Sequence, residues 1–150
     1  MKIIGVIGGN MVNKKTYKTA EETGRLLAVN KAVVVCGGLG GVMEAVCKGA
    51  KKAGGSTIGI LPEKTSKKAN KYVDIAIPTG MGEARNVIIV NAAEGLIAID
   101  GKEGTLSEIA FGLKHGKPVA GIDTYEIKGV VKASGPADAV KKIIKLTEKI

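Results

Sequence analysis

Glycine-containing turns follow four short apolar runs of this chain, and a helix-forming segment follows each turn. The four segments read IGVIGGN (4–10), VVCGGLGGVME (34–44), AIPTGMGEARN (76–86) and AIDGKEGTLSE (98–108). Strands that alternate with helices form parallel sheets, and the carboxyl ends of parallel strands meet at one edge. Open sheets of this kind bind ligands at that edge. We therefore expect the four turns to meet at a single ligand site.

The alternation predicts an α/β fold with a doubly wound, mainly parallel Rossmann-like sheet in a three-layer α/β/α arrangement. A length of 150 residues with no linker or repeat predicts a single domain over 1–150. The last helix carries apolar residues at helical spacing as far as Ile150. We expect strands at 2–7, 32–36, 56–60, 72–77, 95–99, 118–122 and around 128–132, and helices at 14–29, 41–53, 82–93, 105–115 and from Pro136.

The charge of the chain comes from lysine. Its formal net charge is +9, and only two of the 23 basic residues are arginine, Arg25 and Arg85. A lysine-rich, glutamine-free composition is typical of the solvated surface of a heat-adapted protein. The lysines form no stripe interleaved with aromatic residues, so we do not expect nucleic-acid binding.

Several classes of site and location are disfavoured by composition. No apolar run approaches the roughly 20 residues of a membrane-spanning helix, and the apolar start breaks into glycine, so we expect a first strand and a cytoplasmic protein. Cys36 and Cys47 are expected as buried, reduced thiols. With no CxxC motif and with His115 as the only histidine, we predict no metal site.

The glycine turns suit a phosphate group. Glycine lets the backbone approach a ligand closely, and the helix that follows directs unpaired N–H groups and partial positive charge at the turn. The alternative is that the glycines only allow tight corners between strand and helix. Four glycine-rich turns at one edge make this alternative less favoured than a ligand site. The candidate binding residues are Gly8, Gly9, Gly37, Gly38, Gly40, Gly41, Met43, Glu44, Gly82, Lys102, Gly104 and Thr105.

The last two turns carry the candidate catalytic residues, Arg85 and Glu108. An arginine in a lysine-rich chain indicates planar, bidentate recognition of an anion, with an ordinary surface ion pair as the alternative. Thr105 and Glu108 have the T-x-x-E spacing of a capping box, in which each side chain bonds the backbone N–H of the other residue. The alternative is that Glu108 faces the shared edge as a general base or charge stabiliser.

From residue 2 to about residue 122, these segments resemble the Lonely Guy (LOG)-type proteins and the related molybdenum cofactor carrier proteins. The family motif is P-G-G-x-G-T-x-x-E with an upstream arginine, and here DGKEGTLSE at 100–108 follows GMGEARN at 80–86. Asp100 stands in place of the proline, and Lys102 in place of the second glycine. The sequence of these two motifs is more similar to the carrier branch of the family than to the plant-type enzymes.

The resemblance implies two functions. In the enzymatic branch, Arg85 and Glu108 would form the catalytic pair of a phosphoribohydrolase that cleaves nucleoside 5′-monophosphates to base and ribose 5-phosphate. In the carrier branch, the same crevice would hold a nucleotide or a molybdopterin-type ligand without turnover. A nucleic-acid or protein-interaction module on the same fold is a third alternative.

The motif departures favour binding over catalysis. Lysine adopts glycine-only backbone angles at a cost, so Lys102 should reshape the turn, and its cation should lower the pKa of Glu108 and make it a poorer proton donor. No cofactor is required in either branch. The resemblance and the apolar helix at 86–93 also predict a homo-oligomer, a dimer or tetramer.

Overall fold

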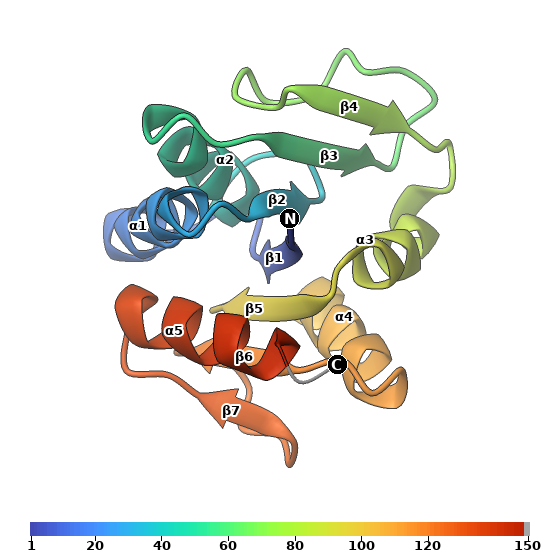
Figure 1. Cartoon of the computed structure of the whole chain (residues 1–150). Coiled ribbons are helices and arrows are strands. Elements are labelled where there is room, and N and C mark those ends of the chain that lie inside the picture. Colours follow the sequence, from blue (N-terminus) through green and yellow to red (C-terminus); the bar gives the residue numbers. More distant parts are fainter. Residues whose placement is uncertain (149–150) are drawn as a thin grey trace.

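The computed structural model describes residues 1–148, so the apolar position predicted at Ile150 lies outside the described residues. Its centre is a seven-stranded sheet with the order β4-β3-β2-β1-β5-β6-β7, in which every pairing is parallel (Figure 1). The strands are β1 (Ile3–Gly8), β2 (Val33–Cys36), β3 (Thr57–Leu61), β4 (Ile75–Pro78), β5 (Gly95–Ile99), β6 (Val119–Ile122) and β7 (Val130–Lys132).

Helices cover both faces of this sheet, which confirms the predicted three-layer, Rossmann-like fold (Figure 1). No helix in residues 1–148 has the length and apolar character needed to cross a membrane. The helical segments are α1 (Lys14–Val29), α2 (Val42–Lys52), the 3₁₀ helix η1 (Gly82–Arg85), α3 (Asn86–Ala92), α4 (Glu103–Lys114) and α5 (Pro136–Thr147).

The winding direction of the sheet reverses at β1. Strands β2, β3 and β4 follow one another on one side of β1, whereas β5, β6 and β7 follow on the other. The connections after β1 and β5 therefore run to opposite faces and leave a crevice between the carboxyl ends of these two strands. This reversal is the point at which doubly wound sheets bind their ligands.

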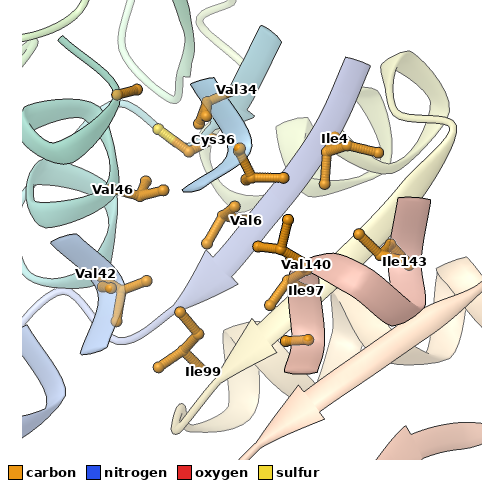
Figure 2. Close-up of a cluster of buried hydrophobic side chains, with 14 of the residues drawn as sticks. Ile4, Val6, Val34, Cys36, Val42, Val46, Ile97, Ile99, Val140 and Ile143 are labelled. Atoms are coloured by element: carbon orange, nitrogen blue, oxygen red, sulfur yellow. The ribbon is translucent and has the colours of Figure 1, made fainter. Parts of the chain in front are cut away.

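The apolar side chains of the strands alternate between two cores. Ile4 and Val6 of β1 pack toward α1, α2 and α5, whereas Ile7 packs toward α3 and α4. Figure 2 shows the first core, with Val46 of α2 and Val140 of α5 directed at the strands. Each fully buried Val, Leu or Ile side chain contributes about 1.5–3 kcal/mol to the stability of the fold relative to an exposed one. The two cores together therefore fix the strands whose ends carry the glycine turns.

Most element boundaries lie within two residues of the prediction, and Asn13 caps α1 as expected, with its Oδ1 accepting the Thr16 N–H at 2.8 Å. The strand predicted at 72–77 begins only at Ile75. The segment 72–74 instead forms hydrogen bonds with Thr57, whose hydroxyl donates to the Tyr72 carbonyl at 2.7 Å.

The helix predicted at 82–93 is divided in two. Gly82 adopts the left-handed conformation with φ of 58°, which does not continue into a regular α-helix, and the 3₁₀ turn η1 follows before α3 begins. This tighter turn buries the side chains of Arg85 and Asn86 at the crevice.

Candidate functional site

A cavity of about 470 Å³ lies at the crevice between the ends of β1 and β5. Its walls come from the turns after β1, β2 and β5 together with η1 and α4, so all four glycine segments contribute to it. Nine residues named from the sequence line it: Gly8, Gly9, Gly37, Met43, Arg85, Lys102, Gly104, Thr105 and Glu108.

The other named residues support the turns without lining the cavity. The Glu44 carboxylate accepts the Tyr17 hydroxyl at 2.8 Å between α1 and α2. The Gly40 N–H donates to Asn10 Oδ1 at 2.9 Å. Gly38 and Gly41 have positive φ and pack closely on neighbouring segments, so for these two the tight-corner alternative describes their role. Gly82 begins η1 in the left-handed conformation and is exposed.

Arg85 is buried, with 7% of its surface exposed, and two of its guanidinium nitrogens bond the protein. Nε donates to the carbonyl of Ile60 at 2.8 Å, and Nη1 donates to Oδ1 of Asn86. No hydrogen bond or ion pair within residues 1–148 uses Nη2, so the alternative of an ordinary surface ion pair is wrong. Burial lowers the pKa of the guanidinium, which nevertheless stays charged at neutral pH.

A hydrogen-bond chain joins Arg85 to the fourth turn. Asn86, which accepts from Arg85, donates through Nδ2 to Ser107 Oγ at 3.3 Å. Ser107 donates in turn to the Gly104 carbonyl at 2.7 Å. Sequence reasoning missed Asn86 and Ser107, because a polar residue beside an arginine carries no spacing signal of its own.

The fourth turn differs from its prediction. Helix α4 begins at Glu103, two residues early, so Thr105 lies inside the first helical turn and the predicted capping box is wrong. The turn tightens at Asp100 and Gly101, with φ of 52° and 110°; aspartate tolerates the left-handed conformation better than most residues. Lys102 itself is extended at φ −125°, so it needs no glycine-only angles, contrary to expectation.

The start of α4 suits an anion. The first intrahelical bond runs from the Leu106 N–H to the Lys102 carbonyl, which leaves the N–H groups of 103–105 without helical acceptors. Gly104, Thr105 and the N-cap Lys102 all line the cavity. Unpaired N–H groups and the positive end of the helix dipole therefore lie at the end of the cavity that Lys102 lines.

Glu108 lies one helical turn further along α4, with 7% of its surface exposed. None of the hydrogen bonds or ion pairs found within residues 1–148 uses its carboxyl group, which lines the same cavity as Arg85. Burial raises the pKa of Glu108 to about 8, although the Arg85 charge acts in the opposite direction. The predicted lowering of the Glu108 pKa by Lys102 is wrong, because burial dominates the shift and the charge that opposes it is that of Arg85.

The cavity has apolar walls that sequence reasoning left out. Met11 follows the first turn, Leu39 belongs to the second, and Pro62 follows β3. Together with Met43, they offer flat contact area next to the anion-binding end. Leu39 lies within the second glycine turn and Met11 directly follows the first, so both could have been found from the sequence, whereas Pro62 is brought in only by the sheet.

The two cysteines are free and buried, as expected, with their sulfur atoms 3.5 Å apart between β2 and α2. Cys36 Sγ also accepts the Gly38 N–H at 3.4 Å, so the thiol helps to shape the second turn. Within residues 1–148, no group of three or more His, Cys, Asp or Glu side chains is arranged to hold a metal ion.

Comparison with known proteins gives concordant matches. The model of the SLOG cluster4 family matches residues 1–148. An uncharacterized protein of Archaeoglobus fulgidus is 46% identical over 142 residues, which cover 94% of this chain and 93% of the relative.

Two solved structures are similar over nearly their whole length. The molybdenum cofactor binding protein of the phototrophic bacterium Rippkaea orientalis superposes with a TM-score of 0.91 at 39% identity, covering 96% of each chain. The molybdenum cofactor carrier protein of Chlamydomonas reinhardtii superposes with a TM-score of 0.88 at 33% identity, covering 98% of each chain.

Proposed function

The chain belongs to the SLOG cluster4 family, and we propose that its cavity binds a phosphate-bearing, molybdopterin-type ligand, as in a molybdenum cofactor carrier. The observation that carries this proposal is the pairing of Arg85 with the start of α4. The buried Arg85 guanidinium, whose Nη2 makes no hydrogen bond within residues 1–148, shares one cavity with Gly104 and Thr105, whose backbone N–H groups have no helical acceptor. Such groups bind phosphate.

The rest of the cavity suits a flat ring. Met11, Leu39, Met43 and Pro62 provide apolar contact area, and a volume of about 470 Å³ is in the usual range for small-molecule sites. The two structures cited above are described as molybdenum cofactor binding and carrier proteins, which supports this class of ligand.

The proposal is tested by loading the purified protein, without oxygen, with molybdopterin cofactor released from a molybdoenzyme. Retained cofactor is measured after gel filtration as the fluorescence of its oxidised pterin. We expect near-stoichiometric retention by the native chain and loss of retention in Arg85→Ala. Arg25→Ala is the matched control, because Arg25 is exposed on α1 and pairs with Glu22 at 2.7 Å. Equal retention by both variants would contradict the proposed site.

A phosphoribohydrolase is the second candidate, and the protonation of Glu108 favours it. A carboxyl group with a pKa of about 8 retains its proton at pH 7 and can donate it to a leaving base. Arg85 would then orient the phosphate of a nucleoside 5′-monophosphate. Incubation with a panel of these nucleotides, with free base measured by chromatography, distinguishes the two functions: release that disappears in Glu108→Gln establishes the enzyme.

A homo-oligomer is the third part of the proposal, and its interface is the outer face of β3 and β4. Ile75 and Ile77 are 55% and 43% exposed although they pair in register with Ile58 and Ile60. Ile60 belongs to the core beneath α3, so the two exposed isoleucines continue that core beyond the last helix on this face.

The charge distribution supports a second copy of the chain as the partner on this face. Residues 75–82 and 86–93 contain no charged residue, in a chain whose net charge is +9. Two copies can therefore approach along these segments with few like charges opposed.

A further inference from the structure

We propose that Glu108 recognises the cyclic guanidine edge of the ligand ring, the 2-amino-4-oxopyrimidine edge that pterins share with guanine, and that binding releases the proton that Glu108 otherwise holds. This inference rests on the proposed ligand class for the cavity. It assigns the carboxyl group to ring recognition, separate from phosphate binding.

The geometry begins with an unused carboxyl group. Glu108 has 7% of its surface exposed and lines the cavity, and none of the hydrogen bonds or ion pairs found within residues 1–148 uses its carboxyl group. Its neighbours Asn86 and Ser107 are already engaged in the chain that holds Arg85. A carboxyl group that faces a cavity and has no protein partner is available to a ligand, and a ligand that pairs with it in this largely buried position gains affinity.

Glu108 and the anion-binding start of α4 lie far enough apart to contact different parts of one ligand. Gly104 lies in the first helical turn among the unpaired N–H groups, and Glu108 lies four residues later, about 6 Å along the axis. A phosphate at the start of the helix therefore leaves Glu108 to contact a different part of the molecule. The apolar walls hold the ring between these two points.

The chemistry selects the ring edge. An ionised carboxylate accepts two parallel N–H bonds, as it does from arginine, and a ring N–H beside an exocyclic amine presents the same pattern. A protonated carboxyl group offers only one acceptor oxygen to such an edge, because the other oxygen carries the proton. Pairing with the cyclic guanidine thus requires that the proton leaves.

The surrounding charges permit this ionisation. The titratable and charged groups around Glu108 are Arg85 and Glu83 from η1, Asp100 and Lys102 from the fourth turn, and Cys36 at the end of β2. Burial raises the pKa of Glu108 to about 8, and Arg85 is the group that lowers it. At pH 7 about nine in ten molecules hold the proton, so ionisation weakens binding only about tenfold.

The test is calorimetry with a pterin carrying a 6-alkyl phosphate, in two buffers with different enthalpies of ionisation. We expect release of about one proton per site at pH 7, falling toward zero at pH 9. The corresponding lumazine phosphate, in which oxygen replaces the 2-amino group, should bind roughly tenfold to a hundredfold more weakly. Both measurements use the native chain and need no variant to fold.

Glu108→Gln provides an independent check, since an amide cannot ionise and has one acceptor oxygen. We expect it to lose proton release and most of the preference for pterin over lumazine, while retaining the Arg85-dependent binding of inorganic phosphate. Equal affinities for the two rings, with no proton released at pH 7, would overturn the role of Glu108 and leave the carrier proposal standing. Failure of both rings to bind would overturn the carrier proposal itself.

Discussion

The guanidinium of Arg85 occupies the space in which a side chain at Gly37 would begin. Its Nη2 lies 2.7 Å from the ideal Cβ position of Gly37, and Met43 Sδ lies 2.6 Å from the same point. The backbone of Gly37 does not adopt the left-handed conformation, so the need for glycine is steric. The second turn thereby determines where the arginine of the third turn can lie.

Gly37→Ala should therefore weaken ligand binding by displacing Arg85. We expect the affinity for a phosphate-bearing pterin to fall on the order of tenfold, the effect of losing one charge-assisted hydrogen bond. Isothermal titration measures it. Gly135→Ala is the control, because Gly135 is extended and has no atom within 4 Å of its Cβ position. An unchanged affinity in Gly37→Ala would show that Arg85 does not depend on this glycine.

Replacing Glu108 with Gln should stabilise the protein increasingly as pH rises. The pKa of Glu108 is about 8 in the folded chain and 4.5 ordinarily, so between these values the folded state holds a proton that the unfolded state has lost. Native stability then falls as pH rises through this window. The advantage of Glu108→Gln in free energy of unfolding should grow by about 3 kcal/mol from pH 5 to pH 8.

Denaturant unfolding at several pH values measures this difference. Glu103→Gln serves as the control, since Glu103 is an exposed carboxylate in the first turn of the same helix. Parallel pH profiles for the native chain and Glu108→Gln would contradict the raised pKa.

Lys102→Ala should reduce phosphate binding in a salt-dependent way. The extended backbone at Lys102 accepts alanine without strain, so α4 keeps its start and loses only a charge. We expect affinity for the phosphate-bearing pterin to fall roughly threefold to tenfold at low salt, and the difference from the native chain to shrink as salt screens the exposed ammonium. Lys114→Ala, at the far end of α4, should have no effect. A loss that is independent of salt would indicate a change in the shape of the turn.

Ile77→Lys should convert the proposed oligomer into monomers. The substitution places a charge in the centre of the apolar face formed by β3 and β4, where a second copy would bury it. Light scattering at micromolar concentration gives the mass. Val29→Lys is matched in chemistry, because Val29 is 60% exposed on α1, and it should leave the mass unchanged. A native chain that is monomeric under the same conditions would rule out the interface.

The order of strands and helices could be predicted because periodicity and turn residues are local properties. The start of α4 was misplaced because Asp100 adopts a left-handed conformation that no side-chain pattern announces. Glu44 was assigned to the crevice by its distance from the glycines, but the packing of α1 on α2 turns it toward Tyr17.

The sequence by itself determined the parallel sheet and the edge at which its glycine turns gather. It also determined that Arg85 and Glu108 would line the same cavity. Only the tertiary structure decided their chemical states. The pKa of Glu108 depends on how far burial removes it from water and on a guanidinium held by Ile60 and Asn86. The desolvation of Glu108 depends on neighbours from distant segments of the chain, so it cannot be predicted from a local sequence pattern.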